Sequence, residues 1–222
     1  MKLVISLGGS LLTRDFSTSG VKKYIDVLKK ISEKTEQLVV VVGGGKICRE
    51  YQAIARELGA TREMQDYIGI KSTQFNASLV ASAFAGYSEI PNNEKELKSA
   101  LKNNKVVVAG GFKGGQSTDA AAAFSAKKIK ADLLINASNV DGVYDSNPAE
   151  NKNAKKIPRL SYSELKQILS KNAQLPGQYG LFDLRAVEII SSAKIKTAFI
   201  DGTDAEEIYR AAFGEHKGSV VE

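Results

Sequence analysis

Short apolar runs that alternate with amphipathic stretches are the feature of this sequence that most limits its fold. Three such runs, Leu3 to Leu7, Leu38 to Val42 and Val106 to Ala109, each end at a pair or triplet of glycines. Short, nearly continuous apolar runs are typical of strands whose two faces are both covered, as in a parallel sheet between helices. The alternation therefore predicts an α/β fold of three layers, in which a mostly parallel central sheet lies between two layers of helices.

Spacing and turn residues predict the remaining elements. Apolar residues recur at helical intervals in several segments, and Pro91-Asn92-Asn93 is a turn signal. We expect further strands over 133–136 and 197–200, an irregular polar loop over 139–148, a helix carrying Ile47, Tyr51, Ile54 and Leu58, an Ala-rich helix capped by Thr118 or Asp119, and helices over 21–31, 69–85, 94–102, 161–171, 183–193 and 205–213. No repeat or low-complexity linker interrupts this order, which predicts one domain with two lobes over residues 1–222.

Composition and charge exclude several classes of protein. With only Cys48 and His216, the chain cannot form an intramolecular disulfide or supply the ligands of a zinc or iron-sulfur site. Its apolar runs fall short of the ~20 residues of a membrane helix, and the N-terminus lacks the features of a secretory signal, so we expect a cytoplasmic protein. The net charge of +6 is spread along helix-like segments, which favours a solvated surface or a funnel for anionic substrates over a nucleic-acid site.

Three glycine-rich segments each follow a predicted strand and precede a predicted helix. They are Gly8-Gly9-Ser10, Gly43-Gly44-Gly45-Lys46 and the longer segment from Gly110 to Thr118. Glycine lets a backbone approach a ligand closely, and a helix start offers free N–H groups and a partial positive charge, so each segment could cradle a phosphate. A glycine after a strand is also ordinary turn chemistry, and one segment alone would not decide between the two. Three of them at the carboxyl ends of parallel strands favour a ligand crevice.

Two common phosphate-binding loops do not match this sequence. Lys46 is followed by Ile47 instead of the Ser or Thr of a Walker A motif, and the sequence contains no dinucleotide pattern G-x-G-x-x-G. Cationic side chains nevertheless accompany the glycines, namely Lys46, Arg49 and Lys113. Transfer of a phosphoryl group depends mainly on positioning and on neutralising spreading charge, which glycine N–H groups, Lys, Arg and Mg²⁺ can provide. Phosphoryl transfer is therefore our hypothesis for the reaction.

The order of these motifs resembles that of the amino acid kinase family, and most closely that of its archaeal UMP kinases. Single motifs are weak signals, whereas the ordered set is specific and extends over almost the whole chain. The matching segments are Gly8-Gly9-Ser10, Val41 to Lys46 with Arg49, Asp66 to Ile70, Gly110 to Ala122, and Ser138 to Tyr144. The resemblance implies the amino acid kinase fold and transfer of the γ-phosphoryl group of ATP to UMP, giving UDP and ADP in pyrimidine nucleotide synthesis, with Mg²⁺ bound together with ATP.

The resemblance also implies that the site residues are divided between two substrates. An N-terminal lobe would bind the acceptor UMP, and a C-terminal lobe would bind ATP. The residues matched to ATP binding are Gly9, Ser10, Gly45, Arg49, Ser138, Asn139, Tyr144 and Asn147. Those matched to UMP binding are Gly44, Asp66, which would accept hydrogen bonds from the ribose hydroxyls, and Phe112, Lys113, Gly114, Gly115, Gln116, Ser117 and Thr118 of the loop around the uracil and acceptor phosphate. The alternative is that Asp66 and Asn139 serve only as helix or turn caps and that Tyr144 is a half-buried packing residue.

The chain departs from the family pattern at Ser6. Many amino acid kinases carry a Lys at this position, where it can bridge the donor and acceptor phosphates, so the charge must come from another residue here. We expect Lys46 to supply it, and the alternative is a solvated surface lysine. Asp119 is the second expected catalytic residue, which would orient a cation or organise the shell of Mg²⁺, unless it serves only as a helix cap. No residue is predicted to be a metal ligand.

The sequence leaves alternatives open for the oligomeric state and for the exact function. The resemblance implies a homo-oligomer, a hexamer built as a trimer of dimers, although the sequence itself shows only apolar helix faces that would serve a core equally well. A kinase of the same fold could act on another acceptor, such as acetylglutamate or an isoprenoid phosphate, and Ser6 leaves room for a non-catalytic nucleotide-binding regulator. An isopentenyl phosphate kinase would be expected to carry a His beside the acceptor loop, whereas His216 lies near the C-terminus.

Overall fold

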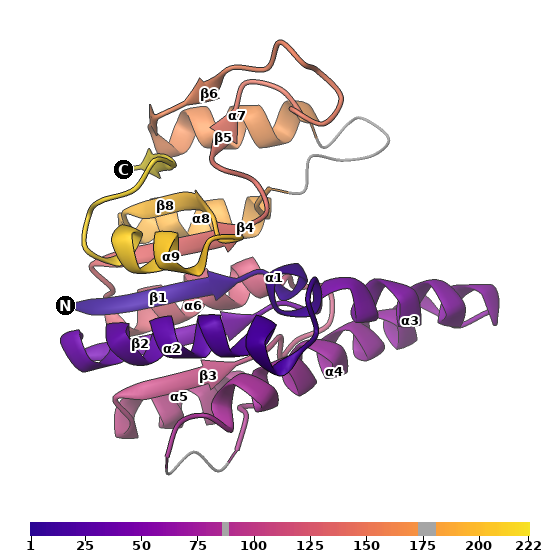
Figure 1. Ribbon diagram of the computed structural model, residues 1–222. Coiled ribbons are helices and arrows are strands. Elements are labelled where there is room, and N and C mark those ends of the chain that lie inside the picture. The colour runs from indigo at the N-terminus through magenta and orange to yellow at the C-terminus, as the bar shows by residue number, and fades with distance from the viewer. Residues whose placement is uncertain (86–88, 173–180) are drawn as a thin grey trace.

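A mostly parallel sheet forms the centre of the protein (Figure 1). The computed structural model describes residues 1–85, 89–172 and 181–222, and within them this sheet has seven strands. β9 (Ser219–Val221) runs antiparallel to β8 (Thr197–Asp201), and β5 (Val143–Tyr144) pairs with β6 (Lys156–Ile157) in a separate hairpin. The strand order of the main sheet is β3 (Val106–Ala109), β2 (Gln37–Val42), β1 (Lys2–Leu7), β4 (Leu133–Ser138), β8 (Thr197–Asp201), β9 (Ser219–Val221) and β7 (Arg159–Leu160).

Helices cover both faces of this sheet, which confirms the predicted three layers. One face is covered by α1 (Gly9–Thr13), α2 (Thr18–Lys34), the C-terminal part of α4 (Arg62–Ala81) and α9 (Ala205–Ala212). The other face is covered by α5 (Glu94–Asn103), α6 (Thr118–Ile129), α7 (Tyr162–Asn172) and α8 (Leu184–Ala193). The remaining helix, α3 (Gly45–Glu57), extends together with α4 beyond the sheet, on the side where α1 follows β1 (Figure 1).

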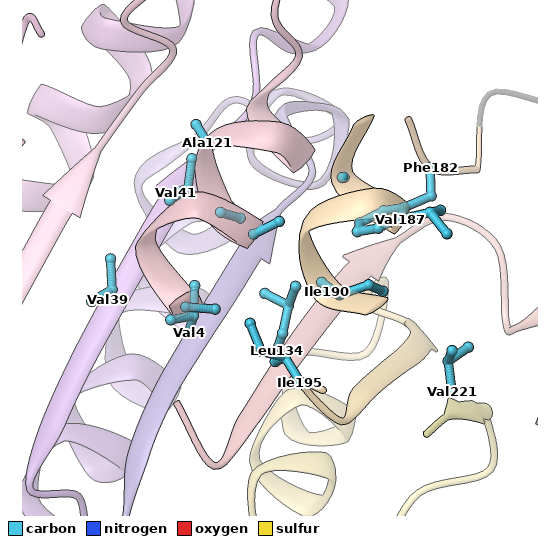
Figure 2. Packing of buried hydrophobic residues seen from close by; sticks show 14 of the residues in the cluster. Val4, Val39, Val41, Ala121, Leu134, Phe182, Val187, Ile190, Ile195 and Val221 are labelled. Atoms are coloured by element: carbon cyan, nitrogen blue, oxygen red, sulfur yellow. The ribbon is translucent and has the colours of Figure 1, made fainter. Parts of the chain in front are cut away.

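The strands β1, β2, β3, β4 and β8 divide their side chains between the two helical layers. In β2, Val39 and Val41 face α6 (Figure 2). Leu38, Val40 and Val42 face the layer of α2 and α4. All five side chains are fully buried, and burial of each contributes about 1.5–3 kcal/mol to folding. β-branched residues also suit the extended backbone. A run that is apolar at every position is therefore what a strand with two covered faces requires.

Several predicted boundaries were wrong, because tertiary context decides them. The helix predicted from residue 69 begins at Arg62, where Thr61 caps it by accepting a hydrogen bond from the Met64 N–H. The first part of this helix lies outside the core, so it has no apolar periodicity to detect. The loop predicted over 139–148 contains β5. The two-residue strands β5, β6 and β7 are too short to show a period, and β9 was also not predicted.

The described ranges contain no helix with the length and apolar character that a membrane crossing requires.

Candidate active site

The first two glycine segments pack directly against each other at the carboxyl ends of β1 and β2. A Cβ atom on Gly9 would collide with the Gly43 carbonyl oxygen, and one on Gly45 would lie 2.6 Å from the Gly9 carbonyl oxygen. Gly45 also has a φ of +68°, which L side chains rarely adopt. These glycines are therefore required for the turns themselves, and the same packing brings the starts of α1 and α3 side by side.

Polar side chains of α4 hold the glycine segments in place. The Asn76 side-chain NH₂ donates to the carbonyl oxygens of Gly43 and Gly44, at 2.9 and 3.1 Å. The Thr73 hydroxyl accepts from the Gly111 N–H at 2.7 Å. Sequence reasoning missed both residues, because they stand among other polar residues of the same helix and belong to no motif.

A cationic pocket lies beside these glycines. Its volume is about 610 Å³, and it is lined by three cationic side chains, Arg14 at the end of α1 and Lys46 and Arg49 near the start of α3. Lys46 is largely exposed and makes an ion pair with Glu50 at 3.4 Å. The lining residues are Ser10, Leu11, Thr13, Arg14, Lys46, Arg49, Asn139, Asp201 and Thr203, so four predicted residues meet here and Arg14, Asp201 and Thr203 join them. Asp201 ends β8, and attention to polar residues at strand ends could have identified it.

A second pocket, which we call the Asp66 pocket, lies on the other side of α3. Its volume is about 420 Å³, and six predicted residues of the acceptor set line it. The Asp66 carboxylate accepts a hydrogen bond from the Gly115 N–H at 3.0 Å and thereby joins α4 to the loop of residues 112–118. The lining residues are Cys48, Gln52, Arg62, Asp66, Gly69, Ile70, Thr73, Gly111, Lys113, Gly115, Gln116, Ser117 and Thr118. Arg62 and Gln52 carry no motif, so sequence reasoning did not find them.

The start of α3 separates the two pockets. Lys46 and Arg49 line the cationic pocket, whereas Cys48 and Gln52 line the Asp66 pocket. The N-terminus of a helix carries a partial positive charge and free N–H groups, so phosphates approaching from either pocket would be attracted to the same point.

Asp119 occupies the first turn of α6, above β1 and β4. The expected cap was wrong: Ser117 caps α6 by accepting from the Ala120 N–H at 3.1 Å. The Asp119 Oδ1 atom instead accepts from the Ser6 hydroxyl at 3.0 Å and from the Asn136 amide at 2.9 Å. Burial, reinforced by the neighbouring negative charge of Asp183, raises the pKa of Asp119 to about 6, although the two hydrogen bonds act in the opposite direction. This carboxyl group therefore gains or loses its proton close to neutral pH.

The other predicted residues surround the two pockets without lining them. A Cβ atom on Gly44 would collide with the Cys48 side chain, one on Gly114 would lie 4.0 Å from the Asp66 Cβ, and the Phe112 ring packs edge-on against Phe124. Gly9 and Gly45 belong to the packed turns already described.

The loop after β4 makes mainly local contacts. The Ser138 hydroxyl accepts from the Val140 N–H at 3.1 Å, and the Asn147 side chain accepts from the Ala149 N–H at 3.1 Å. The Tyr144 hydroxyl donates to Asp141 at 2.7 Å, and this hydrogen bond is the main reason that the pKa of Tyr144 is raised. The loop therefore has a defined shape next to Asn139.

A sequence model described as the amino acid kinase family matches residues 1–201, which is most of the chain. The chain belongs to the amino acid kinase family. Within this family, the uridylate kinase of Methanobrevibacter smithii is 38% identical over 223 aligned residues, which cover 100% of this chain and 99% of that protein. The resemblance noted in the motif order is thereby confirmed.

Solved structures agree with the family assignment. The crystal structure of uridylate kinase from Archaeoglobus fulgidus is 42% identical, covers 100% of both chains and has a TM-score of 0.89. The crystal structure of UMP kinase from Bacillus anthracis has a TM-score of 0.80 at 22% identity, covering 100% of this chain and 95% of that one, and supports the fold alone. The predicted amino acid kinase fold is therefore confirmed.

Proposed function

We propose that this amino acid kinase is a UMP kinase, which transfers the γ-phosphoryl group of ATP to UMP and releases ADP and UDP in pyrimidine nucleotide synthesis. The observation that carries the proposal is the pair of pockets on opposite sides of the start of α3. Nucleotides in these pockets would meet phosphate to phosphate, as in-line transfer requires. The archaeal relatives named uridylate kinases match the chain over its whole length, which supports the choice of UMP.

The cationic pocket is the proposed ATP site. Its three cations would neutralise the triphosphate, with the backbone of Gly9, Ser10 and Gly45 close to the phosphates. The nucleoside would then extend toward the loop after β4, in the C-terminal lobe. Because the Tyr144 hydroxyl already donates to Asp141, Tyr144 would contribute its ring to adenine binding. The residues proposed for the nucleoside are Ser138, Asn139, Tyr144 and Asn147.

The Asp66 pocket is the proposed UMP site in the N-terminal lobe. Asp66 Oδ2 accepts from Gly115, and Oδ1 has no hydrogen-bond partner within the described part of the chain, so it could accept from the ribose hydroxyls. The acceptor phosphate would lie toward Gly44 and the start of α3. The loop proposed to enclose the uracil consists of Phe112, Lys113, Gly114, Gly115, Gln116, Ser117 and Thr118.

The reaction needs no covalent enzyme intermediate. Lys46 would neutralise the transferring group, and Asp119 would orient the cations around it. Among the described residues, no three His, Cys, Asp or Glu side chains are placed to hold a metal ion. Mg²⁺ in phosphoryl-transfer sites usually binds through the substrate phosphates and one or two carboxylates, and we propose that it enters this site together with ATP. When bound, Mg²⁺ would neutralise charge on the β- and γ-phosphate oxygens.

Lys46→Met should lower kcat about 10- to 100-fold and change either KM much less, because the charge acts mainly on the transferring group. The exposed ion pair with Glu50 is weak, so Lys46 can leave Glu50 when a phosphate binds. Initial rates at saturating UMP and ATP measure the effect. Glu50→Gln is the matched control and should stay within about twofold of the wild-type rate. An unchanged kcat in Lys46→Met would make Lys46 a surface residue.

We also propose the homo-oligomer, a hexamer built as a trimer of dimers. The helix predicted to carry Ile47, Tyr51, Ile54 and Leu58 exists, but three of these side chains are exposed, by 57% at Ile54 and 82% at Leu58. Phe75 and Tyr67 of α4 are exposed nearby, by 79% and 54%, and an apolar cavity of about 520 Å³ lies between the two helices. An apolar surface of this kind is typical of a protein–protein interface, and a second copy of the chain is the proposed occupant.

Ile54→Asp should therefore reduce the oligomer to a smaller species, because a charge on this surface would have to be desolvated in the interface. Light scattering after size-exclusion chromatography measures the change, with Phe213→Asp, 41% exposed at the end of α9, as the control that keeps the wild-type mass. A mass unaffected by Ile54→Asp would place the interface elsewhere.

An acceptor panel tests the proposed function. ADP release from ATP should be fast with UMP and much slower with acetylglutamate or isopentenyl phosphate. Preference for acetylglutamate or isopentenyl phosphate would identify a kinase of another substrate class. No turnover with any acceptor, together with retained nucleotide binding, would identify a regulator.

A further inference from the structure

Two buried polar residues lie directly beneath Asp119. Ser6 and Asn136 are register partners on the neighbouring strands β1 and β4, and each is only 4% exposed. Both strands are otherwise almost entirely apolar. Polar side chains in such a position require a specific partner.

That partner is one oxygen atom of Asp119. The Ser6 hydroxyl and the Asn136 NH₂ group both donate to Oδ1, from two different strands. Two donors on the same oxygen restrict rotation of the carboxylate. Within residues 1–85, 89–172 and 181–222, Oδ2 accepts no hydrogen bond, so the second oxygen is left available to the reaction.

Stability alone does not explain the choice of Asn at position 136. Its side-chain oxygen is buried and, among the described residues, receives no hydrogen bond. An unsatisfied buried oxygen costs free energy, and an apolar side chain would avoid that cost. The amide is oriented so that its NH₂ group donates to Asp119, and its side-chain oxygen is then left without a hydrogen bond.

We propose that Ser6 and Asn136 are positioning residues for phosphoryl transfer, which hold the Asp119 carboxylate in its charged form and in one orientation. The inference rests on the proposed function, in which Asp119 orders the cations around the transferring group. Hydrogen bonds from neutral donors to a carboxylate favour the charged form. They oppose the two effects that disfavour it here, burial and the charge of Asp183, which itself accepts from the Ser117 hydroxyl at 2.7 Å.

Ser6→Ala and Asn136→Ala should each lower kcat about 10-fold while both KM values stay within about twofold, because neither residue touches a nucleotide. The acidic limb of the kcat profile should move to higher pH by about half a pH unit or more. Ser6→Thr keeps the hydroxyl and should restore the wild-type rate and profile. Ser125→Ala removes a buried hydroxyl of α6 that bonds within its own helix, and it should leave both unchanged.

A double-mutant cycle separates positioning from a merely structural role. In the Asp119→Asn background, Ser6→Ala should lower kcat no further, because its effect passes through the carboxylate. Additive losses in kcat, or a wild-type pH profile in both single variants, would overturn the proposal.

A titration without substrate keeps the inference separate from the proposed function. The ¹³C-carboxyl signal of Asp119 should titrate at higher pH in Ser6→Ala and Asn136→Ala than in the wild type. An unmoved titration refutes the hydrogen-bonding role even if UMP is phosphorylated. A wild-type protein that transfers nothing to UMP refutes the proposed function. In that case, a titration shifted in the two variants would show that Ser6 and Asn136 hydrogen-bond to the carboxylate, but not that they position it for UMP phosphorylation.

Discussion

Replacing Asp119 by Asn should lower kcat about 100- to 1,000-fold and at the same time stabilise the folded protein at pH 8. The loss of activity follows because the carboxylate is proposed to orient the cations around the transferring group, and a neutral amide would hold them less firmly. The gain in stability follows from burial, which disfavours the charged carboxylate. An Asn side chain at this position carries no charge, and its NH₂ group could also donate to the unsatisfied oxygen of Asn136.

The pH dependence of stability distinguishes this account from a simple packing change. The pKa of Asp119 is about 6 in the folded protein and 3.8 ordinarily, so the folded state binds the proton more tightly. The contribution to stability is therefore fully present below about pH 4 and is lost as the pH rises through 6. At about 1.4 kcal/mol per pH unit the upper limit is about 3 kcal/mol, and solvent screening of the half-buried side chain reduces it to about 1–2 kcal/mol.

Urea unfolding at pH 8 and pH 4 measures this effect. Asp119→Asn should exceed the wild type in unfolding free energy at pH 8 and lose most of that advantage at pH 4. Asp26→Asn, which removes a surface carboxylate paired with Lys22, is the control and should show no such gain. A variant that is less stable than the wild type at pH 8, or as active, would contradict the role given to Asp119.

Asp66→Asn should raise the KM for UMP about 10- to 100-fold and leave the KM for ATP nearly unchanged. Hydrogen bonds from ribose hydroxyls to a carboxylate are stronger than those to a neutral amide. The substitution also weakens the hydrogen bond from Gly115 that joins α4 to the loop of residues 112–118. ATP is proposed to bind in the other pocket, which Asp66 does not line.

Isothermal titration of each nucleotide separately tests the division between the two sites. Glu63→Gln removes a carboxylate from the first turn of the same helix without altering the pocket lining, so UMP affinity should be kept. Equal weakening of UMP and ATP by Asp66→Asn would contradict the assignment of two separate pockets.

The central strands were predictable because their physics is local. A strand covered on both faces is apolar at almost every position, and Leu38 to Val42 shows this directly. The α3 helix was also predictable from a local pattern, the helical spacing of its apolar residues, but the exposure of those residues was not predicted. A sequence shows that Ile54 and Leu58 share a helix face with other apolar residues, and it does not show whether the chain itself covers that face.

The site was predictable where glycine and charge mark it, and less so where contacts join distant strands. Lys46 and Arg49 follow a glycine turn, and the structure brings them to one pocket. The contact of Ser6 with Asp119 joins residues 113 positions apart, and only the strand order places Asn136 beside them. Polar residues in apolar strands are a general signal for such contacts, although their partners emerge only from the fold.

Transfer of label from [γ-³²P]ATP to UMP tests the central claim most directly. If the two nucleotides meet at the start of α3, the label should appear in the β-phosphate of UDP, one for each ADP formed, with little inorganic phosphate. Omitting UMP should abolish ADP formation. Label that is released as inorganic phosphate at the same rate with and without UMP, or that stays in ATP while both nucleotides bind, would contradict a kinase with two facing nucleotide sites.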